Sequence, residues 1–171
     1  MEDMVTIRSL ETKDVDALSA LFEHMLKIDF PEYSEKTKAH IIHKDMNKEA
    51  VLAIINSARQ RSYGAFMKDE LIGFVLGEVI LGGVALCSWI MIKPQFHGKG
   101  IGRDLMAKFE SAMKELGVHS VHLYSAEWNK PFYEKLGYEL VGLYKGSWYG
   151  SNDYLYVKLL QEPKEENFLK A

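Results

Sequence analysis

The fold is decided by one stretch of the chain, Ile90-Met91-Ile92-Lys93-Pro94-Gln95-Phe96-His97-Gly98-Lys99-Gly100-Ile101-Gly102-Arg103. Apolar residues run up to Pro94, which ends a strand, and a helical pattern follows the glycines. Glycine at every second position lets the backbone approach a bulky anion, and the first N–H groups of a helix point outward without internal partners. These donors, the helix dipole and the charges of Lys99 and Arg103 favour a phosphate or pyrophosphate. A plain turn would not need three alternating glycines.

Hydrophobic periodicity predicts the other elements. Strands are expected over residues 5–8, 63–67, 71–80, 85–92, 118–124, 138–144 and 154–160, and helices over 12–30, within 35–60, over 101–116 and over 129–136. Asp69-Glu70 and Gly82-Gly83 are the expected hairpin turns. The fold class is therefore α/β of the α+β type, with a central mixed, mostly antiparallel sheet of about six to seven strands and about four helices. We expect one domain over residues 1–160 and a charged C-terminal tail over residues 161–171.

Composition limits the classes of protein that fit. The 171 residues are enough for one sizeable core, and 47% hydrophobic with 26% charged residues is typical of globular proteins. A net charge of −3, with scattered basic residues, argues against a nucleic-acid partner. The apolar stretch from Leu71 to Ile92 is interrupted by Glu78 and four glycines, so we expect no membrane span.

Cysteine and histidine usage bears on location and metal binding. Residues Met1 to Met4 contain no apolar signal core, and the lone Cys87 cannot form an internal disulfide. Both features favour the reducing cytoplasm. The histidine pairs His40/His43 and His119/His122 lack the grouping of a metal site, so no metal is predicted.

A dinucleotide-binding unit is the main alternative interpretation of a glycine loop of this kind. In such a unit the glycine loop follows the first strand of a parallel fold. An acidic residue then stands about 20 positions later, at the end of the next strand. Here the loop follows about four strands joined by hairpins, and the nearest acidic residue, Glu127, lies beyond the strand. A nicotinamide cofactor is therefore disfavoured.

Two motifs together resemble the GNAT superfamily of acetyl-CoA-dependent N-acetyltransferases. They are the run from Trp89 to Leu105, which contains the glycine loop, and Pro131-Phe-Tyr-Glu-Lys-Leu-Gly-Tyr138. The resemblance implies an acetyl-CoA site in which the backbone of Ile90, Met91 and Ile92 binds the pantetheine arm. It also implies further cofactor-binding residues at His97, Gly98, Lys99, Gly100, Ile101, Gly102, Arg103 and Asn129. Asn129 matches the family's asparagine when counted from the glycine loop, whereas counting back from Tyr133 gives Ala126. His97 stands where the family often has Gln or Arg.

The resemblance also implies the catalytic acid, at Tyr133, which falls on the family's tyrosine that protonates the departing CoA thiolate. A phenol suits this role, because its ordinary pKa of about 10 exceeds the ~8.5 of a thiol. The family's usual glutamate positions hold other residues here. Glu78 and Glu127 are the nearest carboxylates that could act as general base through a water, and proton loss to bulk water is a third route.

The sequence gives the least information about the acceptor of the acetyl group. The loop after the first helix carries Asp29, Glu32 and Tyr33, which could attract a cationic amine. The aromatic stretch 144–154 could wall the acceptor groove or form a homodimer contact. The expected reaction is acetylation of a primary amine, on a small molecule such as a polyamine or on a peptide N-terminus or lysine. The alternatives are a CoA-binding regulatory module without catalysis and a dinucleotide-dependent oxidoreductase.

Overall fold

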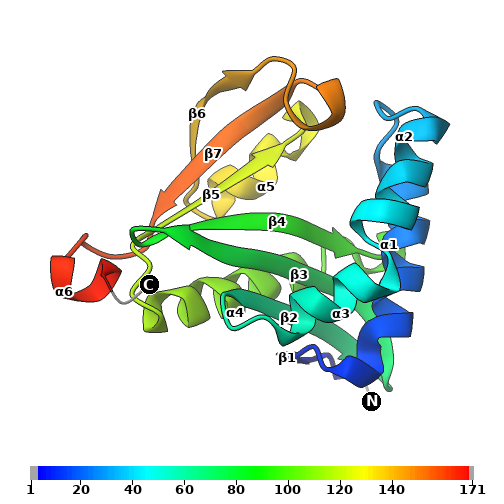
Figure 1. The fold of residues 1–171 in the computed structure, drawn as a ribbon, viewed down its shortest axis with the longest axis horizontal. Coiled ribbons are helices and arrows are strands. Elements are labelled where there is room, and N and C mark those ends of the chain that lie inside the picture. The colour runs from blue at the N-terminus through cyan, green and yellow to red at the C-terminus, as the bar shows by residue number, and fades with distance from the viewer. Residues whose placement is uncertain (1–3, 170–171) are drawn as a thin grey trace. The chain divides into compact units, whose positions relative to one another are not determined.

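The computed structural model describes residues 4–169, which contain seven strands and six α-helices (Figure 1). The strands are β1 (Thr6–Ser9), β2 (Gln60–Met67), β3 (Glu70–Leu81), β4 (Val84–Ile92), β5 (Ser120–Ser125), β6 (Glu139–Tyr144) and β7 (Asp153–Leu159). The α-helices are α1 (Val15–Asp29), α2 (Glu35–His40), α3 (Lys48–Asn56), α4 (Ile101–Glu115), α5 (Lys130–Lys135) and α6 (Glu165–Phe168). Short 3-10 turns precede α1, α4, α5 and β7, and a π-helical turn over Ile41–Asp45 follows α2.

The strands hydrogen-bond in the order β1-β2-β3-β4-β5-β7-β6. β1 and β2, β5 and β7, and β6 and β7 pair antiparallel, whereas β4 and β5 pair parallel over Val84–Leu86 and Ser120–His122. The parallel pair follows from the crossover through α4, since parallel neighbours cannot be joined by a hairpin. The predicted mixed, mostly antiparallel sheet is confirmed.

The described residues fall into two compact units, the first made of residues 4–76 and 89–109. Its core packs α1 side chains such as Phe22 against β3 and β4 residues such as Phe74 and Met91. α3 contacts both α1 and β2. At the start of α1 the two guanidinium nitrogens of Arg8 donate to the carboxylate of Asp14 at 2.7 and 2.9 Å. The main-chain N–H of Glu11 donates to the same carboxylate, which fixes the first turn.

The second unit consists of residues 77–88 and 110–169. Figure 1 shows α5 beside β5 and β7, and the Tyr133 ring of α5 lies 5.3 Å from the Tyr156 ring of β7. A partly buried ion pair joins Lys158 Nζ of β7 to Glu110 Oε2 of α4 at 2.7 Å. Lys158 also lies over the Tyr138 ring, 5.4 Å from its centroid. Aromatic packing and this partly buried ion pair therefore contribute to the stability of the unit.

The turn between β2 and β3 differs from the prediction. The two turn residues are Lys68 and Asp69, with φ of 48° and 65°, rather than Asp69 and Glu70. Positive φ at both positions gives the twist that a two-residue hairpin needs, and Asp tolerates it better than most residues. The Gly82-Gly83 turn is as predicted, with φ of 59° and 79°.

The last described residues pack within the second unit. Gln161 Nε2 donates to the Val118 carbonyl at 2.7 Å, and the Asn167 carbonyl approaches Gly117 so closely that a Cβ there would clash. The division into a domain over 1–160 and a tail over 161–171 stays a prediction. Within residues 4–169, no helix is both long enough and apolar enough to cross a membrane.

Candidate active site

One edge of β4 is open along the residues that precede the glycine loop. The N–H of Lys93 donates to the Ile72 carbonyl of β3 at 2.9 Å. Because backbone groups alternate along a strand, Met91 also directs its N–H and C=O toward β3, whereas Ile90 and Ile92 direct theirs to the opposite edge. The register of β4 with β5 ends at Leu86. Of the three residues predicted to bind pantetheine, Ile90 and Ile92 therefore offer main-chain groups, and Met91 contributes a buried side chain.

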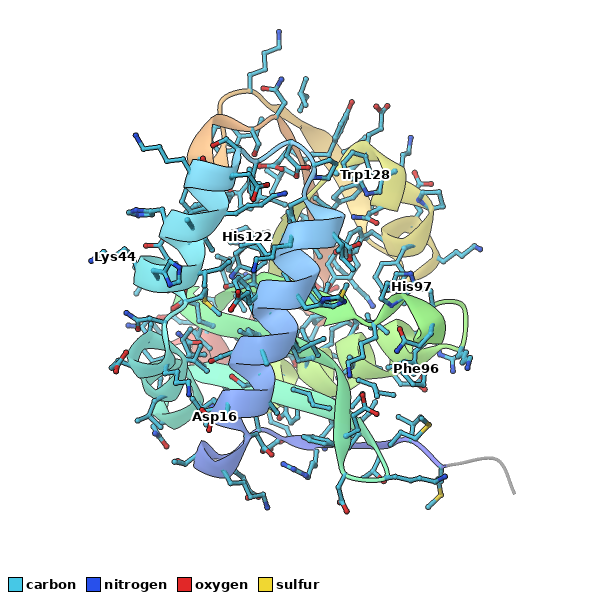
Figure 2. All side chains as sticks on the ribbon, turned by 90° about the vertical axis from the view of Figure 1, so that its right-hand side faces the viewer. Asp16, Lys44, Phe96, His97, His122 and Trp128 are labelled. Carbon is cyan, nitrogen blue, oxygen red and sulfur yellow. The ribbon has the colours of Figure 1, made fainter. Side chains whose placement is uncertain are left out.

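His97 contacts this open edge. Its Nε2 lies 2.7 Å from the carbonyl oxygen of Ile92. Because a carbonyl only accepts, Nε2 carries the hydrogen of this bond. Figure 2 shows His97 and Phe96 in the loop that leads to α4. The imidazole thus covers one of the acceptors that a ligand strand would use.

The glycine loop has the backbone geometry of an anion cradle. Gly98 and Gly100 have φ of 75° and 81°, and a Cβ at Gly98 would meet no atom within 4 Å. α4 begins at Ile101, and the N–H of Asp104 makes the first-turn bond, to the Gly100 carbonyl at 3.0 Å. The N–H groups before Asp104 are the helix-start donors that lack intrahelical acceptors. Open space over outward amides at a helix start fits a pyrophosphate.

The two predicted cations of the loop differ in availability. Arg103 Nε donates to the neighbouring Asp104 carboxylate at 2.8 Å. This bond raises the pKa of the guanidinium and occupies one of its N–H donors. Lys99 lies with Nζ 5.1 Å from the centroid of the Phe96 ring and is exposed. Lys99 is therefore the cation with fewer competing contacts.

The residues predicted on the acceptor side lie at the end of α1 and just beyond it. Asp29 and Glu32 are exposed, whereas Tyr33 is buried and stacks on Phe30 at 5.6 Å. Phe30 in turn meets the Trp89 ring of β4 edge-on at 5.7 Å. Partial burial raises the pKa of Asp29, and the positive potential of His97 and His24 opposes that rise. An aromatic stack, with exposed carboxylates at residues next to it in the sequence, thus contacts the strand that precedes the glycine loop.

In the second unit, Tyr133 is buried on α5 with 5% of its surface exposed. Its ring packs between Tyr138, at 5.9 Å, and Tyr156, at 5.3 Å. Burial raises the pKa of the Tyr133 phenol, and a hydrogen bond with the Ser125 side chain acts in the opposite direction. The phenol therefore keeps its proton at neutral pH.

Ser125 also contacts Asn129. Asn129 Nδ2 donates to Ser125 Oγ at 3.0 Å, across the turn between β5 and α5. Ser125 is buried, and it is not among the residues predicted from the sequence. The signal that marks it is the four-residue spacing of Ser125, Asn129 and Tyr133, which brings three polar groups together only once the strand ends at Ser125.

The two predicted bases are carboxylates of the second unit. Glu127 is exposed in the turn before α5, and it contributes, with Glu134, to raising the pKa of Tyr156, whose main cause is burial. Glu78 is half-buried on β3. Neither residue has a position that singles it out as the base.

A further titratable residue is His122 of β5, which is half-buried and labelled in Figure 2. Burial lowers its pKa, and a hydrogen bond with the Ala85 backbone partly opposes this. Its ring meets Tyr124 edge-on at 5.8 Å, and Tyr124 contacts Tyr144 and Trp148. The aromatic stretch predicted after β6 therefore packs on this face of β5. Across the described range, no three His, Cys, Asp or Glu side chains are grouped so as to hold a metal.

Comparison with known sequences identifies the family. Residues 29–145 match the description "Acetyltransferase (GNAT) domain". The chain is 28% identical over 144 residues to a spermidine N(1)-acetyltransferase of Thermoplasma acidophilum, which covers 80% of this chain and 89% of that protein. It is 33% identical over 79 residues to a ribosomal protein bS18-alanine N-acetyltransferase of Haemophilus influenzae, covering 45% of this chain and 53% of that protein.

Solved structures agree. The PaiA N-acetyltransferase from Thermoplasma acidophilum, in complex with coenzyme A, superposes with a TM-score of 0.79 at 25% identity, over 91% of this chain and 99% of that chain. An aminoglycoside 6'-N-acetyltransferase complexed with coenzyme A shares the fold, with a TM-score of 0.71 at 19% identity over 94% and 99%. Because the family match spans more than half of the sequence, the chain belongs to the GNAT family of acetyltransferases, enzymes that use acetyl-CoA as acyl donor.

Proposed function

We propose that the protein transfers the acetyl group of acetyl-CoA to a primary amine by direct attack, with Tyr133 as the acid that protonates the departing thiolate. The observation that carries the proposal is the buried phenol of Tyr133 on α5, whose pKa is raised by burial so that it keeps its proton at neutral pH. The cradle of Gly98 and Gly100 and the open edge of β4 support the binding of the acyl donor. Acetyl-CoA supplies the thioester, and side chains of this protein carry out the proton transfers.

Proton transfer follows from the bonds that change. The amine nitrogen forms a C–N bond with the acetyl carbon, the C–S bond breaks, and sulfur takes its electron pair. Tyr133 gives its hydroxyl proton to that sulfur and regains a proton from solvent. The amine must lose one proton during the reaction, and a carboxylate that accepts it through a water would lower the barrier.

Glu127 and Glu78 are the two carboxylates we propose for this proton. Glu127 is tested first, because it lies in the turn that leads into α5, the helix that carries Tyr133. Glu127→Gln should then lower kcat and shift the acidic limb of its pH profile, while Glu78→Gln leaves the profile unchanged. The opposite pattern would assign the base to Glu78, and no change in either variant would favour proton loss to bulk water.

A small cationic amine is the acceptor that we propose first. The exposed carboxylates of Asp29 and Glu32 would attract an ammonium, and the aromatic stack of Phe30 and Tyr33 offers an apolar wall for its carbon chain. A relative is named for spermidine and another for the alanine of a ribosomal protein, so a peptide N-terminus or lysine is the second acceptor class. A cytoplasmic location and a homodimer contact through the aromatic stretch after β6 are further parts of this proposal.

The experiment is a thiol-release assay with acetyl-CoA and a panel of spermidine, a peptide with an N-terminal alanine, and an acetyl-blocked lysine peptide. The protein's own thiol will not interfere, because burial raises the pKa of Cys87 to about 12. We expect turnover to be fastest with spermidine. Tight CoA binding by calorimetry without turnover of any amine would contradict the proposal and favour a regulatory module.

A further inference from the structure

We infer that Asp153 at the start of β7, together with the rings of Tyr144 and Trp148, forms a cation site for a non-reacting ammonium group of a polyamine acceptor. The inference rests on the proposed acetylation of an amine. The nitrogen that attacks the thioester must be uncharged, whereas an ammonium held by a carboxylate stays protonated, so the site would hold another nitrogen of the acceptor. All residues of the site belong to the second unit.

Asp153 is a buried carboxylate without a cationic partner among the described residues. The residue exposes 8% of its surface, and its Oδ2 lies 2.9 Å from Ser151 Oγ. The same Oγ lies 2.8 Å from the Trp148 carbonyl oxygen, and because a serine has one hydroxyl hydrogen, the two acceptors share it. Among residues 4–169, no other donor and no salt bridge reaches this carboxylate. Buried carboxylates are normally paired, so Asp153 is one positive partner short.

The second oxygen of this carboxylate is open to a partner from outside the chain. Oδ1 accepts no hydrogen bond from a described residue, yet it is not one of the side-chain oxygens that are enclosed without a partner. A donor from solution can therefore reach Oδ1 and leave Ser151 on Oδ2. An ammonium suits this position, because it supplies N–H donors and a full positive charge.

Aromatic rings lie on the same face of the sheet as Asp153. In the register of β6 with β7, Tyr144 stands directly opposite Asp153, so the two side chains share one face. The Tyr144 ring centroid lies 5.8 Å from that of Tyr124 on β5, and the Trp148 ring meets Tyr124 edge-on at 6.0 Å. Tyr144 and Trp148 expose 51% and 54% of their surface, so their rings are accessible. Aromatic faces attract ammonium groups, and the carboxylate adds a charge–charge attraction.

Two basic side chains of β5 and β7 do not oppose a cation at this site. The His122 ring meets the Tyr124 ring edge-on at 5.8 Å, and burial lowers the pKa of the imidazole, so that it is uncharged at neutral pH. Lys158 lies on the opposite face of β7 from Asp153, because side chains alternate along a strand, and it pairs there with Glu110. An ammonium at Asp153 is therefore repelled by neither residue.

The test is spermidine binding, measured by isothermal titration calorimetry with CoA present in place of acetyl-CoA, so that no acetyl transfer occurs. Asp153→Asn keeps the shape of the side chain and an acceptor for Ser151, but it removes the charge. Its Kd for spermidine should be about tenfold weaker than that of the wild type, the loss expected for one hydrogen bond to a charged group. An unchanged Kd in Asp153→Asn would overturn the inference.

Two further variants separate the site from a long-range effect of charge and from a subunit contact. Glu139→Gln removes an exposed carboxylate of β6 on the same face, and it should change the Kd less than twofold. A loss equal to that of Asp153→Asn would overturn the inference. Trp148→Leu should weaken the Kd about three- to fivefold, because it removes one exposed ring. An unchanged Kd, with a weaker dimer in analytical ultracentrifugation, would assign that ring to a subunit contact and contradict its place in the site.

Thermal unfolding distinguishes a binding role from a purely structural one. Without ligand, Asp153→Asn should keep the wild-type Tm or raise it, because the variant no longer buries an unpaired charge. Spermidine should then raise the Tm of the wild type clearly more than that of the variant. A lower Tm of the variant and equal shifts with spermidine would show that Asp153 serves only the fold.

Turnover separates this inference from the proposed function. Asp153→Asn should raise the KM for spermidine about tenfold and keep kcat within about twofold. Both constants should stay unchanged for butylamine, which has a single nitrogen. Spermidine acetylation with an unchanged KM would reject the site and keep the proposed reaction. Asp153-dependent binding of spermidine by a protein that acetylates no amine would keep the site and reject only the reaction.

Discussion

His97 Nε2 lies 2.7 Å from the carbonyl oxygen of Ile92, on the edge of β4 that faces away from β3. This is the edge to which a pantetheine amide would add as an extra strand. The imidazole and the amide would use the same acceptor. We therefore expect the ring to swing away when CoA binds, which an exposed side chain can do at low cost.

His97→Ala should bind CoA as tightly as the wild-type protein, or up to about threefold more tightly, because one exposed hydrogen bond is no longer broken. Isothermal titration calorimetry measures the Kd. His24→Ala, which removes an exposed histidine of α1, is the control and should not change it. A tenfold weaker Kd in His97→Ala would mean that the imidazole contacts the ligand directly.

Gly100→Ala should weaken CoA binding at least tenfold. Gly100 has a φ of 81°, which strains any residue with a Cβ, and the new Cβ would lie 2.9 Å from the Arg103 guanidinium, which would have to move beside the phosphates. Gly146→Ala is the matched control, because Gly146 has a φ of 63° and open space around it in the turn after β6. Both variants should lose about 1 kcal/mol of stability. Only Gly100→Ala should lose affinity, and equal affinities would place the phosphates elsewhere.

Tyr133→Phe should lower kcat by about 100-fold, the usual contribution of a positioned acid, with little change in the Kd for CoA. Tyr138→Phe is its control, because it removes the hydroxyl of a neighbouring buried tyrosine that has no proposed part in the reaction. The control should keep kcat within about twofold, since its hydroxyl donates no proton in the proposed reaction. Similar losses in both variants would indicate disturbed packing rather than loss of an acid.

Asp14→Asn should lower the free energy of unfolding at pH 7 by about 2 kcal/mol, because it removes the carboxylate charge that accepts hydrogen bonds from the Arg8 guanidinium. The folded-state pKa of Asp14 is lowered by Arg8, so its stabilisation is complete above the unfolded value near 3.9. It is lost as the pH falls through the folded value. Urea unfolding at pH 7 and pH 3 should show a difference between wild type and variant that shrinks in acid.

Asp16→Asn serves as the control for that prediction. Asp16, labelled on α1 in Figure 2, is exposed and pairs with Lys48 at the surface. An exposed pair of this kind contributes little to stability, so the loss should be much smaller than in Asp14→Asn. A larger loss in Asp16→Asn than in Asp14→Asn would contradict the assignment.

Lys158→Met should destabilise the second unit by about 3 kcal/mol, since it leaves the Glu110 carboxylate buried without its partner. The double variant Glu110→Leu/Lys158→Met should recover most of that loss, because an apolar pair of similar size carries no desolvation cost. Urea midpoints of the three proteins measure the effect. A double variant less stable than Lys158→Met would contradict the ion pair's role.

The fold could be predicted from the sequence where local chemistry determines local structure. The glycine loop, the helix after it and the Gly82-Gly83 turn each follow from residues that allow few other conformations. The turn at Lys68 and Asp69 could not be placed to the residue, because neither is a glycine and the flanking apolar runs fit either register.

In the candidate site, only the residues that belong to a recognisable motif could be predicted from the sequence. Ser125 and His122 carry no motif, and their environment comes from contacts between residues distant in the sequence. His122 becomes half-buried because β5 pairs with β4 and β7, and Ser125 gains its partners only when α5 packs on β5. Whether Tyr33 would be exposed or buried also depended on Phe30 stacking against it.

The central claim is transfer of an acetyl group from acetyl-CoA to an amine nitrogen. Its most direct test measures free CoA and N-acetylspermidine from one reaction, the first by thiol release and the second by mass spectrometry. The account predicts equal amounts of the two products, formed by the wild-type protein and much more slowly by Tyr133→Phe. Thiol release without N-acetylspermidine or any other acetylated amine would contradict it.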